Sequence, residues 1–188
     1  MPELQSGCEI TAANIMLQYY GYKPSKTELL KYIPSSNDFY NVGGKRYGPN
    51  PWKTFVGDPS SNHYGCYAPV ISNAMNAYLL EQGGTHDAVN LTGVSTGNLY
   101  KYVDSGLPVI VWVTVGMQKP SSGDGWYLGD SDKYCKWIQG EHCMVLIGYD
   151  QKHAIFSDPL DQRGTVSYDR ELFEQRFHDL SSQAVAVR

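Results

Sequence analysis

The sequence predicts an α+β fold in which an N-terminal helical half packs on a mainly antiparallel β-sheet. Two observations predict this class. Apolar residues recur at helical spacing through much of the first half, whereas apolar runs typical of strands follow from about residue 109. Helices first and strands second, with hairpin-length connections, is the α+β order. We expect one domain spanning 1–188, which is long enough to bury a core without disulfide staples.

Two S-x-x-E patterns predict where the first helices begin. Ser6 and Glu9 form a capping box that places Cys8 at the second helical position, and Ser25 and Glu28 repeat the pattern before a short helix. An apolar stripe follows the first box, as an amphipathic helix requires. Further helices are expected over residues 69–82, 96–105 and 169–177, and the second box opens a helix that ends before Pro34.

The remaining segments divide into strands and one long loop. From 35 to 65 the chain is dense in Gly, Pro, Asn, Ser and Tyr, and we expect a long irregular excursion. Loops of that length are usually functional or disordered, and the aromatic residues here favour a packed loop that forms one wall of a substrate cleft. Strands are expected over residues 109–115, 134–138, 143–149 and 154–158.

Charge and hydropathy exclude several classes of partner. The net charge is −4 and the pI is about 5.7, with no cluster of Lys or Arg, which argues against nucleic acid or an anionic membrane. The longest apolar run, residues 109–115, is far shorter than the roughly 20 residues of a membrane span. Four cysteines are too few and too irregular for a disulfide framework, although a single Cys66–Cys135 bridge is compatible with the sequence.

Cys8 is the candidate nucleophile. The N-terminus of a helix presents unpaired N–H groups and a partial positive charge, which favour a thiolate. Among the five histidines, His142 directly precedes a buried strand that would hold it rigidly, so it is the candidate base. If strands 143–149 and 154–158 form a hairpin, Asp158 lies near His142 and can orient its imidazole.

The sequence around these residues resembles the C39-like peptidases, a bacterial branch of the papain-like cysteine peptidase superfamily. Cys8 precedes His142 by 134 positions, within the spacing of papain-like enzymes, although the papain sequence pattern around the cysteine is absent. The stretches that carry the resemblance span nearly the whole chain in the family order: PELQSGCEITA from 2, YYGY from 19, YGPNPW from 47, GEHCMVLIGYD from 140 and SDPL from 157.

The resemblance implies a papain-like fold and a peptidase with Cys8, His142 and Asp158 as its catalytic residues. We also expect no cofactor and no metal, a peptide or protein substrate, a monomer, and a secreted or cell-surface bacterial protein whose upstream segment has been removed, with a cytoplasmic location left open. The family usually carries an oxyanion-hole glutamine shortly before the Pro-Glu-Leu stretch, and that position is missing here. Gln5 is a possible substitute, but the backbone N–H of Cys8 is the preferred donor.

Three alternatives stay open at this stage. Ligand types for zinc occur in His63-x-x-Cys66 and in His142-Cys143 with Cys135, but without the paired spacing of zinc sites. A binding module could keep the fold without catalysis, presenting its tyrosine-rich loop to a peptide or cell-wall ligand. An acyl or peptidyl transferase would use the same three residues. Cys143 is expected to point away from His142 into the core.

Overall fold

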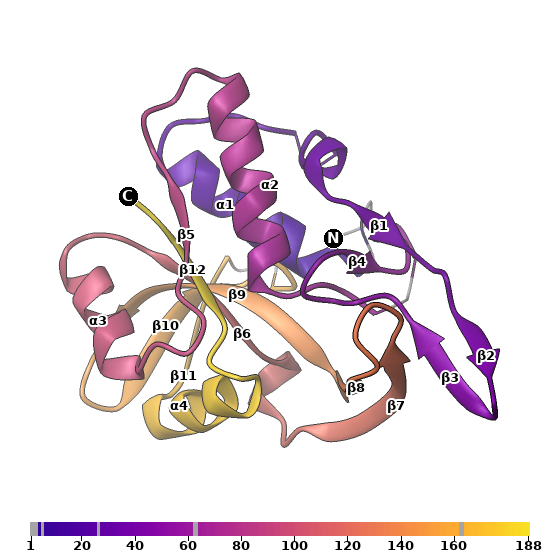
Figure 1. Cartoon of the computed structure of the whole chain (residues 1–188). Helices are drawn as coiled ribbons and strands as arrows, with labels where there is room; N and C mark the ends of the chain where they lie inside the picture. Colours follow the sequence, from indigo (N-terminus) through magenta and orange to yellow (C-terminus); the bar gives the residue numbers. More distant parts are fainter. Residues whose placement is uncertain (1–3, 5, 26, 62–63, 162–163) are drawn as a thin grey trace.

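The computed structural model describes residues 4, 6–25, 27–61, 64–161 and 164–188. The described residues form a large antiparallel sheet with helices on both faces and a smaller sheet at one side (Figure 1). The helical elements are α1 (Cys8–Tyr19), α2 (Ala68–Glu81), α3 (Thr96–Asp104) and α4 (Arg170–Asp179), with 3-10 turns η1 (Leu29–Tyr32) and η2 (Val115–Met117).

The large sheet has six strands, and every neighbouring pair is antiparallel. In sheet order they are β11 (Thr165–Asp169), β10 (His153–Ser157), β9 (Glu141–Tyr149), β6 (Val109–Thr114), β12 (Ala184–Val187) and β5 (Ala88–Asn90). The prediction of a mainly antiparallel sheet is therefore confirmed.

Helices cover both faces of this sheet, so it is buried on both sides. Successive side chains of a strand point to opposite faces. On one face Trp112 and Cys143 pack with α1 and α2, and on the other face Val113 and Met144 pack with α3 and α4. Figure 1 shows the two helix pairs above and below the sheet. The sequence predicted that N-terminal helices pack on one face of the sheet, as α1 and α2 do. It predicted α3 and α4 as helices but not that they cover the opposite face together.

The segment from 35 to 65 is more regular than predicted. It contributes four short strands, and a fifth strand that was not predicted, β7, joins them. The smaller sheets are β2 (Tyr40–Val42), β3 (Lys45–Gly48), β7 (Ser121–Leu128) and β8 (Tyr134–Gln139) in that order, and the parallel pair β1 (Ser35–Ser36) with β4 (Phe55–Val56). Close packing explains the regularity: a Cβ atom at Gly48 would lie 2.3 Å from the Phe39 ring and 2.9 Å from Trp126. The expected irregular excursion is thus wrong for much of this segment.

The two S-x-x-E patterns have different outcomes. At the second, the Glu28 N–H donates to Ser25 Oγ at 3.1 Å and the Ser25 N–H donates to Glu28 Oε2 at 3.3 Å, the reciprocal bonds of a capping box. The element that follows is the 3-10 turn η1 with Glu28 as its N-cap, rather than the short helix that the pattern predicted. At the first, Gly7 is the N-cap with no side-chain cap, and Cys8 is the first helical residue rather than the second. The Ser6 hydroxyl donates to the Ser61 carbonyl, and Glu9 turns inward.

The other predicted elements lie close to their expected places. The helices expected at 69–82, 96–105 and 169–177 are α2, α3 and α4, and the four expected strands are β6, β8, β9 and β10. Strand β9 begins at Glu141, so His142 lies inside the strand rather than at its mouth. None of the helices in the described ranges has the length and hydropathy needed to cross a membrane.

Helix α4 offers a test of local capping. Asp169 is its N-cap, and Asp169 Oδ1 accepts the Leu172 N–H at 2.9 Å. We expect Asp169→Ala to lower the free energy of unfolding by about 1 kcal/mol, because an N–H in the first turn loses its acceptor. Urea unfolding measures the change, and Asp169→Asn, which keeps the acceptor, should lose less. An unchanged midpoint in Asp169→Ala would show that the cap does not contribute.

Candidate active site

Cys8 lies at the start of α1, where the helix meets the sheet. The preceding Gly7 lies tightly against Leu4, since a Cβ atom at Gly7 would be 2.5 Å from Leu4 Cβ. The Gly7 carbonyl accepts both the N–H and the hydroxyl of Thr11, each at 2.9 Å. These contacts fix the entry into the helix, and the Cys8 side chain is buried against β9 with 7% of its surface exposed.

His142 and Asp158 form a buried hydrogen-bonded pair. Strands β9 and β10 pair as the predicted hairpin, and His142 Nε2 lies 2.8 Å from Asp158 Oδ1. The same carboxylate oxygen accepts the Leu160 N–H at 2.8 Å, which holds it after the turn at Pro159. The predicted neighbourhood of these two side chains is therefore present.

The charge state of Asp158 fixes the histidine tautomer. Burial alone would raise the pKa of Asp158, but the hydrogen bond and charge of His142 and the Leu160 N–H outweigh it and lower the pKa below its ordinary value. An ionised carboxylate can only accept, so the proton of a neutral His142 lies on Nε2 and leaves Nδ1 as an acceptor. An imidazole held in this way can take a proton from a thiol at Nδ1.

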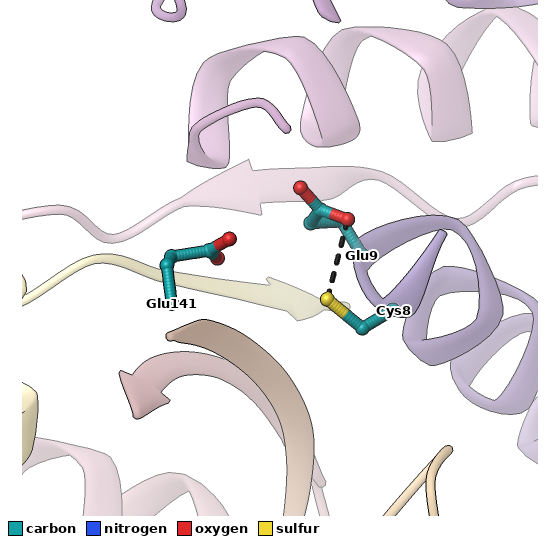
Figure 2. Close-up of side chains that lie close together, drawn as sticks. All are labelled: Cys8, Glu9 and Glu141. Carbon is teal, nitrogen blue, oxygen red and sulfur yellow. Dashed lines mark hydrogen bonds between the residues drawn. The ribbon is translucent and has the colours of Figure 1, made fainter. Parts of the chain in front are cut away.

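The Cys8 thiol meets two carboxylates rather than this imidazole. Its Sγ donates to Glu9 Oε2 at 3.4 Å, and Glu141 extends from β9 toward the same point (Figure 2). One ligand atom from each of the three side chains lies within 4.8 Å of the others. The remaining Glu9 oxygen, Oε1, accepts the Cys66 N–H at 2.8 Å. Glu141 Oε1 is buried and has no hydrogen-bond partner among the described residues.

Burial, together with the two acidic neighbours, reverses the expected effect of the helix start on the pKa of Cys8. Burial, and then the charges of Glu9 and Glu141, raise the pKa of Cys8 well above its ordinary value, against a smaller lowering by the Cys143 N–H. Burial raises the pKa of Glu9 to about 7. Burial and the charge of Glu9 raise the pKa of Glu141 as well. The expectation that the helix start gives Cys8 a low thiol pKa is therefore wrong for this state of the site.

The alternation of β9 explains the separation. Glu141 and Cys143 lie on the α1 side of the sheet, since Cys143 belongs to that core. The residue opposite His142 is Val113, which belongs to the core on the α3 and α4 side. No hydrogen bond joins Cys8 to His142 in the described part of the chain, and the thiol's partner is Glu9. The structure thus unites His142 with Asp158 and places Cys8 beside the two neighbours of His142 in β9.

Other predicted site residues have mixed outcomes. Gln5 and His63 lie outside the described residues, so neither the oxyanion-hole substitution nor the His63-x-x-Cys66 set can be placed. The zinc set that uses His142 and Cys143 with Cys135 does not gather, because His142 and Cys143 point to opposite faces. The cluster that does form consists of Cys8, Glu9 and Glu141. Sequence reasoning missed it because Glu9 was assigned to the helix cap, and no sequence pattern indicates that Glu9 is buried next to a thiol.

All four cysteines are free thiols, so the possible Cys66–Cys135 bridge is wrong. Cys66 is fully buried beneath the start of α2, where its carbonyl accepts the Trp112 indole N–H at 3.0 Å. Cys135 lies on β8 and pairs with Trp126 of β7. Cys66 therefore lies in the segment before α2, whereas Cys135 lies on a strand of the smaller sheet. Cys143 is a core residue, as predicted.

An open cavity of about 600 Å³ lies between the β7–β8 hairpin and Tyr64. It reaches Tyr64, the neighbour of Gly65, and Gly140, the neighbour of Glu141. Of the segment from 35 to 65, which was expected to form one wall of the cleft, only Tyr64 lines this cavity, and β7 and β8 supply most of the rest. The lining residues are Tyr64, Ser122, Gly123, Asp124, Trp137, Gln139 and Gly140.

Known proteins share this architecture along the whole chain. A solved structure from Bacillus anthracis, assigned as a C39-like peptidase, is 32% identical and matches with a TM-score of 0.86 over all of this chain and 91% of its own. The peptidase domain of Streptococcus ComA, a bifunctional ABC transporter of a quorum-sensing pathway, matches with a TM-score of 0.51 over all of this chain and 97% of its own. At 17% identity it supports the fold alone.

A sequence relative and a family model agree with these structures. The uncharacterised protein YvpB of Bacillus subtilis (strain 168) is 27% identical over all 188 residues of the chain, which cover 71% of YvpB. The resemblance inferred from the sequence is confirmed: the Peptidase_C39-like family model matches residues 2–185, and the chain belongs to that family of papain-like cysteine peptidases.

Proposed function

We propose that this chain is a cysteine peptidase that hydrolyses peptide bonds through Cys8, His142 and Asp158. The observation that carries the proposal is the buried 2.8 Å hydrogen bond between His142 Nε2 and Asp158 Oδ1, in a chain of the C39-like peptidase family that carries Cys8 at the start of α1. An ionised carboxylate is costly to bury, and its hydrogen bond with Nε2 leaves Nδ1 of a neutral His142 as the acceptor that a general base needs.

In the proposed reaction the Cys8 side chain leaves Glu9, and its Sγ must come within hydrogen-bond reach of His142 Nδ1, where it does not lie in this state of the site. Its proton passes from Sγ to Nδ1 of His142, and the thiolate attacks the peptide carbonyl to form a C–S bond. The N–H groups of the first turn of α1, with Cys8 as the preferred donor, stabilise the oxyanion. The imidazolium then protonates the leaving amine as the C–N bond breaks. Finally His142 takes a proton from water, the hydroxide breaks the thioester, and Cys8 recovers a proton.

A catalytically silent binding module is the second candidate. It is favoured by the resting contact of Cys8 with Glu9, because a thiol that donates to a carboxylate and has a raised pKa is a poor nucleophile. The two candidates differ in whether substrate turns Cys8 toward His142. Turnover of any peptide that depends on Cys8 decides between them.

Substrate and location are part of the same proposal. We assign a peptide or protein as substrate, bound in the open cavity beside Gly65 and Glu141. A secreted or cell-surface location is supported by the 15 tyrosines, since such a composition is common in loop-rich extracellular proteins. Fractionation of the producing cells with an antibody against the chain tests this location.

The nucleophile is tested with a library of internally quenched peptides. We expect Cys8→Ala to lower the cleavage rate by roughly 10³-fold or more, because no other group can form the thioester. Cys135→Ala removes a half-buried thiol of β8 and should keep the parental rate. If Cys8→Ala cleaves as fast as the parent chain, Cys8 is not the nucleophile; if the parent cleaves nothing, the binding module is favoured.

The role of Asp158 is tested through turnover in the same assay. We expect Asp158→Asn to lower kcat by roughly 10- to 10⁴-fold while leaving residual cleavage, because the amide no longer fixes the imidazole tautomer. The exposed Asp87 provides a matched control, and Asp87→Asn should keep the parental kcat. An equal effect of the two substitutions would contradict the proposed orienting role.

The same variant reports the contribution of this pair to stability. The folded-state pKa of Asp158 is lowered, so its stabilisation is present above the unfolded-state pKa of about 3.9 and is lost as pH falls through the folded-state pKa. Asp158→Asn should therefore be less stable than the parent at pH 7, and this difference should shrink below about pH 4. Urea unfolding across that range measures it, and a difference independent of pH would indicate packing instead.

A further inference from the structure

We propose that Cys8, Glu9 and Glu141 form a binding site for a divalent transition-metal cation of the zinc class. The bound cation would occupy the sulfur that the proposed peptidase uses as nucleophile. Figure 2 shows the three side chains converging from the start of α1 and the start of β9. The site does not depend on peptidase activity, because thiolate and carboxylate oxygens bind such cations whether or not the thiol attacks peptides.

The distances suit one tetrahedral ion. Zinc bonds of about 2.3 Å to sulfur and about 2.1 Å to oxygen place two such ligands about 3.6 Å apart. Cys8 Sγ and Glu9 Oε2 are already 3.4 Å apart. One carboxylate oxygen of Glu141 lies within 4.8 Å of the ligand atoms of Cys8 and Glu9. A modest rotation of this carboxylate would bring it into bonding distance as the third ligand. Three protein ligands with an open fourth position are the arrangement of accessible zinc sites.

The orphaned oxygen of Glu141 is an independent indication of a ligand. Glu141 Oε1 is buried without a hydrogen-bond partner among the described residues, and it belongs to a carboxylate aimed at Glu9 and Cys8 (Figure 2). A buried polar atom that is left unsatisfied costs about 1–3 kcal/mol, and more when it is charged. Two carboxylates facing each other increase that cost, and a dication between them satisfies the orphan and neutralises both charges.

The surroundings hold the two carboxylates in place. Glu9 Oε1 is engaged by the Cys66 N–H, which leaves Oε2 for the ion, as hydrogen bonds to first-shell ligands commonly do. Gly65 allows both carboxylates to lie here, because a Cβ atom at this position would be 2.3 Å from Glu9 Oε1 and 3.3 Å from Glu141 Oε2. The open cavity reaches Tyr64 and Gly140, the neighbours of Gly65 and Glu141.

The donor set selects the class of cation. A thiolate is a soft ligand, and calcium or magnesium would instead require six or more oxygens. Zinc and cobalt(II) accept a mixed sulfur and oxygen set. On binding, the thiol proton of Cys8 and the protons held by the Glu9 and Glu141 carboxyl groups leave to solvent, and a metal–sulfur bond forms. The ion then holds Cys8 as a bound thiolate that cannot attack a carbonyl.

Cobalt(II) gives a direct test on the metal-stripped, reduced full chain. We expect one equivalent to produce a thiolate-to-cobalt absorption band in the near ultraviolet, and one equivalent of zinc to remove it. Cys8→Ser should abolish the band, and Glu141→Gln should weaken cobalt affinity at least tenfold while circular dichroism shows an intact fold. Glu171→Gln, on the surface of α4, is the matched control and should bind as the parent does.

Alkylation of Cys8 provides a second readout. Zinc should slow its modification by iodoacetamide at least tenfold, measured by peptide mass spectrometry, and should leave the modification rate of Cys135 unchanged. No thiolate band in the parent, or a band that persists in Cys8→Ser, would overturn the proposal. Equal affinity in Glu141→Gln and Glu171→Gln would do so too. Neither readout uses peptide cleavage. A chain that binds cobalt but cleaves no peptide would contradict only the proposed peptidase, and a chain that cleaves peptides but binds no cobalt would contradict only the metal site.

Discussion

The register of β9 is the constraint on which the rest of the site depends. This strand is buried on both faces and paired on both edges, and three consecutive residues, Glu141, His142 and Cys143, carry side chains to alternating faces. A shift of one residue would exchange all three side chains between the faces. His142 would lose Asp158, and both Glu141 and Cys143 would leave α1. The two apolar cores hold the register, so the packing of the sheet sets the geometry of the polar groups.

Two opposing effects act on the Cys8 thiol, and their magnitudes decide between them. A helix N-terminus stabilises a negative charge by about 0.3–1 kcal/mol at the surface and by about 2 kcal/mol in favourable buried positions. Burial of an unpaired charge costs several kcal/mol. A second negative charge about 4 Å away adds about 4 kcal/mol at an effective dielectric constant near 20. Burial therefore dominates, the neighbouring carboxyl groups add to it, and the resting thiol stays protonated.

Sequence patterns predicted the elements well where local signals and tertiary packing agree. The Ser25 and Glu28 box forms because both side chains lie at the surface, so each can accept the other residue's backbone N–H. The Ser6 and Glu9 box has the same letters and fails, because Glu9 is fully buried and is bound by the Cys66 N–H. Cys66 lies 57 positions from Glu9 along the chain, so no local sequence pattern can predict this hydrogen bond.

The same reasoning explains what was found of the site and what was missed. A hairpin is a local structure, so the pairing of β9 with β10 and the meeting of His142 with Asp158 could be predicted. The relation of Cys8 to Glu141 depends on how α1 lies across the sheet, which only long-range packing determines. Strand β7 was missed since Gly123 and Gly125 weaken its pattern; the Tyr134 ring covers Gly125 and replaces the missing side chain.

The position of β12 has a consequence for how the chain is made. This strand, Ala184–Val187, lies between β6 and the edge strand β5 of the large sheet, and it is fully buried. Until it leaves the ribosome, β5 has no neighbour, β6 has an open edge, and both apolar cores lack a wall. Folding of the six-stranded sheet is therefore expected to wait until β12 has left the ribosome, and the nascent chain exposes strand edges until then.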